Sequence, residues 1–143
     1  MCDSFLIKLD NIFSQFAMLL DQRFSRRVIT TEDAIRYTFF HCLCKYAEIS
    51  PTNVVLEYPH PEIKDTRIDT YVELGGDLGA MAFEFKFDRA RPSGNNQTRT
   101  RNAGSLFADI FRLAKLLSHR RLHSYFVYVT DQEMATYLRN PSN

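Results

Sequence analysis

The run from residue 81 to residue 88, Met-Ala-Phe-Glu-Phe-Lys-Phe-Asp, constrains the fold of this chain more than any other feature. Successive side chains of a β-strand point to opposite faces of its sheet, so the alternation predicts a strand with two unlike faces. One face is wholly apolar and belongs in a core: Met81, Phe83, Phe85 and Phe87. The other face carries charges: Glu84, Lys86 and Asp88. Charges are common on the open face of a half-exposed antiparallel strand, so this run alone predicts structure and not function.

A second strand, over residues 67–74, precedes the first and ends at Gly75-Gly76-Asp77, which is typical hairpin-turn material. Its alternation puts one set of side chains on one face: Ile68, Thr70 and Val72. The other face carries Asp69, Tyr71 and Glu73. If the two strands pair through this turn, Asp69 lies near Glu84 and Lys86. Aspartate is disfavoured inside strands, so its place in the middle of this one suggests a function.

Two carboxylates and one ammonium on a sheet face suit metal-dependent phosphate chemistry. Carboxylate oxygens are the ligands that Mg²⁺ prefers, and Mg²⁺ needs only one or two of them beside substrate phosphates. A bound metal activates water for attack, and a lysine ammonium can orient that water or offset charge on the phosphate. Asp69, Glu84 and Lys86 are therefore candidate catalytic residues, with Mg²⁺ as the expected cofactor and Mn²⁺ as a substitute.

The remaining sequence predicts an α/β protein with elements in the order α, α, β, β, β, α, β, α. Helices are expected at 3–24, 31–48, 103–119 and 131–138, and the other strands at 54–58 and 124–130. The helix over 103–119 has a predicted apolar face made of Leu106, Ile110, Leu113 and Leu117. Residues 1–25 form an amphipathic helix that packs on the core or on a partner chain, with a homodimer as the second possibility. Residues 26–143 form the main domain.

Composition limits the class of protein. A chain of 143 residues with 45% hydrophobic content fits one globular domain. Its three cysteines make no disulfide framework. No signal peptide is visible, and no apolar run approaches the ~20 residues that cross a bilayer. The sequence therefore predicts a cytoplasmic protein without a membrane partner.

Charge is unevenly distributed, although the net charge is only +1. Between residues 89 and 121 there are eight basic side chains and one acidic side chain, Asp109. The predicted loop of this segment, over 91–102, is rich in Arg, Thr and Asn, the usual phosphate-contacting residues. DNA is the expected partner, through Arg89, Arg91, Arg99 and Arg101. The plain alternative is a solvated charged surface.

Asp69, a gap of fourteen residues and then Glu84-Phe85-Lys86 resemble the D…(D/E)-x-K signature of the PD-(D/E)XK nuclease superfamily. That superfamily includes type II restriction enzymes, archaeal Holliday-junction resolvases and RecB-type exonucleases. The resemblance implies a restriction-endonuclease-like core with a mixed central sheet of about four strands flanked by helices (α-β-β-β-α-β), to which this chain adds an N-terminal helix. It covers residues 31–130, and one departure is that Ile68, not proline, precedes Asp69.

The same resemblance implies a magnesium-dependent deoxyribonuclease. Asp69 and Glu84 would hold the metal and Lys86 would position water. Many members also bind metal through a glutamate on the first core helix, where Glu32 lies, although the helix dipole alone accounts for a glutamate there. Asp33, Glu48 and Glu57 stay open for this role. Two other functions stay open as well: a catalytically silent nucleic-acid-binding or assembly module, and a structural protein whose strand charges pair with one another.

Overall fold

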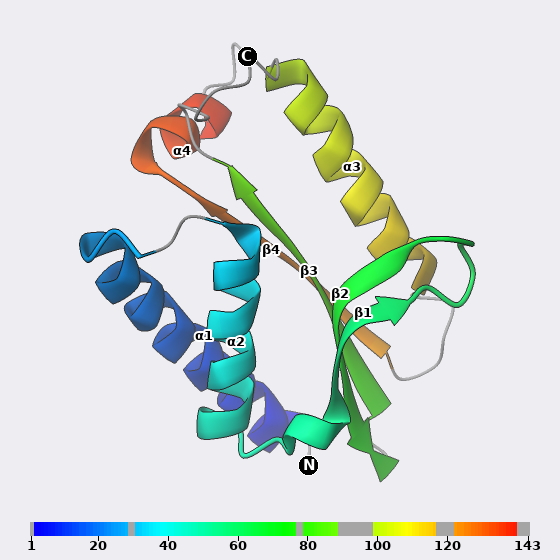
Figure 1. Ribbon diagram of the computed structural model, residues 1–143. Coiled ribbons are helices and arrows are strands. Elements are labelled where there is room, and N and C mark those ends of the chain that lie inside the picture. The colour runs from blue at the N-terminus through cyan, green and yellow to red at the C-terminus, as the bar shows by residue number, and fades with distance from the viewer. Residues whose placement is uncertain (1, 29–30, 77–78, 89–98, 117–121, 140–143) are drawn as a thin grey trace.

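The computed structural model describes residues 2–28, 31–76, 79–88, 99–116 and 122–139. Its centre is a four-stranded sheet in the order β1-β2-β3-β4 (Figure 1). The strands are β1 (Val54–Pro59), β2 (Arg67–Gly75), β3 (Gly79–Asp88) and β4 (Leu122–Thr130). The first three strands pair antiparallel and β4 pairs parallel with β3, so the sheet is mixed. The α/β class and the predicted order of elements are confirmed.

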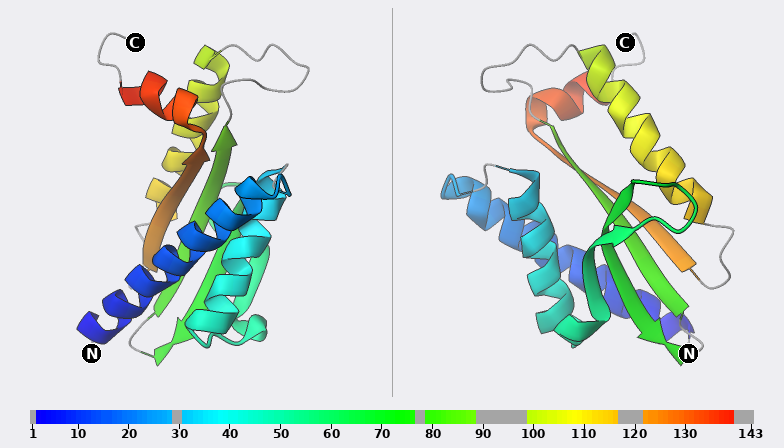
Figure 2. Two further views of the ribbon diagram at one scale, coloured as in Figure 1. Left: turned by 90° about the vertical axis from the view of Figure 1, so that its left-hand side faces the viewer. Right: turned by 45° about the vertical axis from the view of Figure 1, so that its right-hand side comes forward.

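Helices cover both faces of this sheet, as Figures 1 and 2 show. The helices are α1 (Cys2–Ser25), α2 (Glu32–Tyr46), α3 (Arg99–Leu116) and α4 (Gln132–Arg139), with a short 3₁₀ helix at Pro51–Asn53. The apolar side chains of β3 pack beneath α1 and α2, where Met81, Phe83 and Phe85 are buried. Ala82 lies on the opposite face, beneath Leu113 and Leu116 of α3. The predicted apolar face of β3 is therefore buried beneath α1 and α2, and the opposite face packs against α3.

The apolar stripe of α1 is buried within the same chain. Leu9, Ile12, Phe16 and Leu20 all lie in the core beneath α1 and α2. Since this stripe is occupied by the chain's own core, a homodimer through α1 would have to use another face of the helix, and it stays a prediction. Among the described residues, no helix combines the length and hydrophobicity that crossing a membrane requires.

Helix α3 differs from its prediction in both its start and its inward face. It begins at Arg99 rather than at residue 103, so Arg99 and Arg101 belong to its first turns and not to a preceding loop. Arg89 and Arg91 lie outside the described residues. The predicted apolar face is wrong in part: Leu113 is buried, but Ile110 is 41% exposed.

The inward face of α3 is partly polar. Asp109 is buried beside Leu113, whereas Phe107 is 67% exposed and Phe111 59% exposed. Arg112, one turn after Asp109, reaches the carboxylate of Glu84 on β3. Turning Asp109 and Arg112 toward the sheet carries the two phenylalanines to the outside, because residues three and four apart share a helix face. The inward face of α3 therefore combines two buried leucines, Leu113 and Leu116, with the ion-paired Asp109 and Arg112.

Candidate active site where β2 and β3 diverge

Strands β2 and β3 separate at the position of the candidate carboxylates. Their pairing ends at Thr70 and Phe83, one step before Asp69 and Glu84 would face each other. Beyond this point β3 continues to pair only with β4, as far as Asp88. Backbone N–H groups of β3 that face β2 lose their strand partners there, and buried N–H groups require acceptors.

Two carboxylates supply those acceptors. Asp69 Oδ2 accepts a hydrogen bond from the backbone N–H of Phe85 at 2.8 Å. Glu32 Oε2, from the first turn of α2, accepts one from the N–H of Phe87 at 3.0 Å. Side chains from two distant segments therefore replace the missing strand, and this fixes both carboxylates against β3.

The backbone of β1 is irregular beside this divergence. Glu57 has φ 55°, a left-handed conformation that is rare for a residue with a side chain. It stands between the pairs Leu56–Thr70 and Tyr58–Ile68. Leu56 packs on the α1–α2 side of the sheet, whereas Tyr58, two residues later, packs on the α3 side. In a regular strand these two side chains would share a face. The side chains of β1 therefore change from one face of the sheet to the other at Glu57, and those of its partner β2 change with them.

The same turn corrects one prediction for β2. Ile68 packs on the α3 side and Val72 on the α1–α2 side. The expected common face of Ile68, Thr70 and Val72 is therefore wrong for Ile68. Asp69 lies between Ile68 and Val72, in the part of β2 where the side chains change from one face of the sheet to the other.

Arg36 of α2 neutralises this carboxylate. Its Nη1 donates to Asp69 Oδ1 at 3.1 Å and also pairs with Glu57, while Nη2 pairs with Asp33. Burial lowers the pKa of Arg36, but the surrounding carboxylates outweigh that effect and raise it above its ordinary value. Arg36 is therefore a permanent cation that holds Asp69 and Glu57 together.

Glu84 is the most deeply buried charged side chain of the site, with 1% of its surface exposed. Arg112 donates to both of its carboxylate oxygens, Nε to Oε1 and Nη2 to Oε2, each at 3.4 Å. Burial, together with the nearby Asp69, raises the pKa of Glu84 to about 8 despite Arg112. At neutral pH the Glu84 carboxyl therefore keeps its proton for most of the time unless a further cation is present.

Lys86 stands at the more open side of the site. Its ammonium donates to Ser105 Oγ on α3 at 3.2 Å. Burial raises the pKa of Glu32, and the charge of Lys86 acts in the opposite direction, as does the hydrogen bond from Phe87. Asp69 also acts on both Glu32 and Glu84, so all four residues lie within electrostatic range of one another. The structure thus brings together Glu32, Asp69, Glu84 and Lys86.

Three further residues of the site are missing from the sequence-based prediction: Arg36, Asp109 and Arg112. Arg36 lies four residues after Glu32 and so shares its helix face, a signal that was available in the sequence. Arg112 belongs to the basic segment that was expected to form a DNA-binding surface. It instead points inward, where it pairs with Glu84 and with Asp109 at 2.7 Å.

The donor set fits a hard divalent cation. Asp69 and Glu84 lie side by side, and burial together with the charge of Asp69 raises the pKa of Glu84 even though Arg112 pairs with it. A divalent ion bound between the two carboxylates would favour their ionised forms and displace the proton. As they stand, the described residues present no group of three or more His, Cys, Asp or Glu side chains arranged to hold a metal.

His60 anchors the loop between β1 and β2 to α3. Its Nδ1 accepts hydrogen bonds from the backbone N–H groups of Glu62 and Ile63 at 3.1 and 3.0 Å. The proton therefore resides on Nε2, which donates to the carbonyl oxygen of Arg112 at 3.0 Å. This buried imidazole therefore has a structural role.

We expect His60→Ala to lower the free energy of unfolding by about 1–3 kcal/mol, because it leaves buried backbone groups without partners. Urea denaturation measures this loss. The matched control is His123→Ala, at an exposed position of β4, which should change stability by less than about 0.5 kcal/mol. Equal effects of the two substitutions would contradict the anchoring role of His60.

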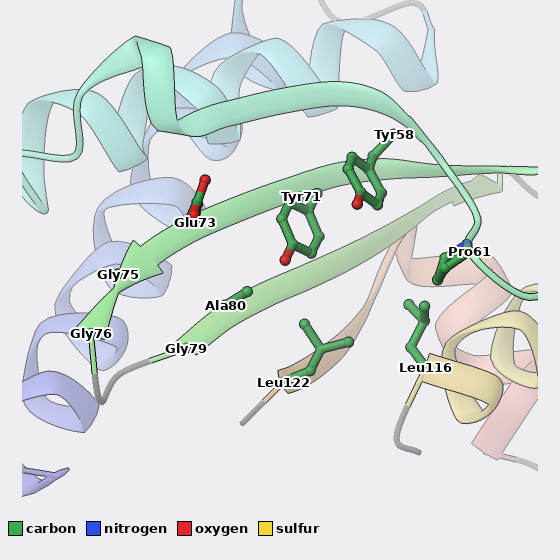
Figure 3. Close-up of a pocket in the computed structure, with 10 residues that line it drawn as sticks. All are labelled: Tyr58, Pro61, Tyr71, Glu73, Gly75, Gly76, Gly79, Ala80, Leu116 and Leu122. Carbon is green, nitrogen blue, oxygen red and sulfur yellow. The ribbon is translucent and has the colours of Figure 1, made fainter. Parts of the chain in front are cut away.

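A pocket of about 380 Å³ lies beside the carboxylates on the α3 side of the sheet. Figure 3 shows the rings of Tyr58 and Tyr71 side by side, above Leu122 and near Pro61 and Leu116. The two rings stack with centroids 4.2 Å apart. Tyr71 faces Ala82, which is two residues before Glu84, so the pocket adjoins the site without sharing its charged residues.

Comparisons with known proteins identify no relative of this chain. No protein-family model matches the chain, and neither the curated proteins nor the solved structures contain a match. The inference of function therefore rests on the residues of the site itself.

Proposed function

We propose that this protein is a metal-dependent nuclease that hydrolyses phosphodiester bonds in DNA, with a restriction-endonuclease-like core of the PD-(D/E)XK type. One observation carries the proposal: Asp69, Glu84 and Lys86 gather where β2 and β3 diverge, and burial beside Asp69 raises the pKa of Glu84 to about 8. The resemblance to the D…(D/E)-x-K signature is independent support from the sequence. A cytoplasmic location is part of the proposal, since Cys42 and Cys44 are free thiols.

Each side chain has a distinct role in this mechanism. Asp69 and Glu84 would hold Mg²⁺, with Glu32 as a further ligand and Mn²⁺ as a substitute. The ion, when bound, supplies Lewis-acid activation of the phosphate and of water. Lys86 donates a hydrogen bond that orients the attacking water and offsets charge developing on the phosphate oxygens. Arg36 and Arg112 hold the two carboxylates in position. Arg89, Arg91, Arg99 and Arg101 are proposed to contact the DNA backbone.

A second function is favoured by a specific observation. Arg36 already pairs with Asp69, and Arg112 already pairs with Glu84. Such pairs can satisfy both carboxylates without a metal, as in a silent nucleic-acid-binding or assembly module. The two functions differ in whether a divalent ion also binds these carboxylates.

The deciding experiment incubates the protein with linear, circular and branched DNA in Mg²⁺, Mn²⁺ or EDTA, and measures Mn²⁺ binding by calorimetry. The nuclease requires cleavage that depends on metal and disappears in EDTA. It also requires Mn²⁺ binding that is lost in Asp69→Asn, which keeps an oxygen acceptor for the Phe85 N–H. DNA binding without Mn²⁺ binding or cleavage would establish the silent module instead. Absence of all three would refute both functions.

A further inference from the structure

A second pocket, of about 480 Å³, lies between the last turns of α1 and the middle of α2, on the far side of α2 from the carboxylates. Its walls include Leu19 and Val28 and several polar side chains: Gln22, Arg23, Arg26, Tyr37, Thr38 and His41. None of these lining residues is acidic. A concave site with two guanidinium groups and no carboxylate favours an anion.

The end of α1 fixes the position of the two arginines. Val28 N–H donates to the carbonyl oxygen of Arg23 at 3.0 Å, and Arg27 N–H to that of Phe24 at 2.9 Å. These two bonds form a Schellman motif, in which Arg27 takes the left-handed conformation with φ 57°. The motif folds the chain back over the last turn of the helix. Val28 thereby closes one wall of the pocket next to Arg23.

Arg23 has an unused hydrogen-bond donor. Its Nε is buried and has no hydrogen-bond partner among the described residues. Within the same part of the chain, neither Arg23 nor Arg26 forms an ion pair. Buried donors are nearly always satisfied, so the Nε–H of Arg23 is available to an acceptor that comes from outside the chain.

The pocket and the carboxylate site flank the same helix. Glu32 and Arg36 face the site, whereas Tyr37 and His41 line the pocket. An α-helix with its side chains is about 10–12 Å wide, so the two places are separated by about that distance. Figure 1 shows the end of α1 spread apart from the start of α2, with the two helices nearer to each other toward the other end of α2. A nucleic-acid groove has a similar width, about 6–12 Å, between its phosphate-bearing walls.

We propose that the Arg23–Arg26 pocket binds a backbone phosphate of the nucleic acid whose cleavage is assigned to the Asp69–Glu84 site, so that the substrate straddles the N-terminal half of α2. The inference rests on the proposed function for its substrate. The phosphate contact itself needs neither metal nor cleavage, so it can be tested separately.

The test measures the affinity of Arg23→Gln/Arg26→Gln for a duplex with 5′-hydroxyl ends, in EDTA, as a function of salt concentration. We expect affinity to fall several-fold and the negative slope of log affinity against log salt to shrink by about one, as for each lost phosphate contact. The control is Lys8→Gln, which removes an exposed positive charge from the other end of α1. Arg26→Gln alone is the second variant, because Arg26 is exposed and its loss does not disturb the core.

Two outcomes would overturn the pocket assignment. In the first, the arginine variants bind with the same slope and affinity as Lys8→Gln. In the second, inorganic phosphate shifts the Nε–H resonance of Arg23 while the 5′-hydroxyl duplex does not, which would identify a site for free phosphate. Absence of cleavage in Mg²⁺ and in Mn²⁺, together with the expected change of slope in EDTA, would refute the nuclease and leave the phosphate site standing.

Discussion

Replacement of Lys86 with alanine is expected to lower the rate of DNA cleavage by about 10²–10³-fold, the usual effect of removing one donor from a developing anion. The ammonium of Lys86 bonds only to Ser105 Oγ among the described contacts, at the open side of the site. Its loss should therefore change the chemical step and leave the fold intact. Single-turnover cleavage at saturating Mg²⁺ measures the rate, and circular dichroism checks the fold.

The control for this substitution is Lys64→Ala, which removes an exposed lysine from the loop between β1 and β2. It should cleave DNA at the rate of the unaltered protein. If Lys86→Ala also cleaves at that rate, the proposed mechanism is wrong, whatever metal the protein requires.

The second large effect is a pH dependence of stability that arises from Glu84. Its pKa is about 8 in the folded protein against 4.5 for the ordinary carboxyl. Between these values the folded state binds a proton that the unfolded state has released, so stability is greatest below pH 4.5 and falls as pH rises toward 8. The expected slope from this group approaches 1.4 kcal/mol per pH unit, and the total is on the order of 4 kcal/mol.

Glu84→Gln should remove this slope, because an amide does not titrate. Urea denaturation of both proteins from pH 5 to pH 9, without divalent ions, should show the variant gaining stability relative to the parent as pH rises. Glu73→Gln, at an exposed position of β2, is the matched control and should keep the parent's slope. Parallel profiles for the parent and Glu84→Gln would contradict the raised pKa of Glu84.

Much of the fold follows from local patterns. The alternation of Met81, Phe83 and Phe85 predicts both the strand and its buried face, and the amphipathic pattern of the N-terminal segment predicts a helix that packs on the core. These patterns succeed because burial of apolar side chains is the dominant force at those positions. The proximity of Glu84 and Lys86 follows from the same alternation.

Other parts of the site depend on interactions that a single sequence does not display. The inward face of α3 includes Arg112, which pairs with Glu84, 28 residues earlier in the chain, while Phe107 and Phe111 are exposed. Beside the divergence of β2 from β3, β1 has a left-handed backbone at Glu57, a residue type that gives no hint of that conformation. Asp69 is thus predicted to lie in the site, but its role as an acceptor for Phe85 is not.

The two carboxylates bonded to β3 also protect the molecule from its neighbours. An open strand edge is a template onto which a strand of another molecule can add, and soluble proteins shield such edges with charge. Asp69 and Glu32 occupy the N–H groups of Phe85 and Phe87 on that edge. Catalytic residues usually lower stability. Here the residues assigned to chemistry would also block the addition of a strand from another molecule to this edge. Selection against self-association would therefore retain both acids even in a descendant that had lost its activity.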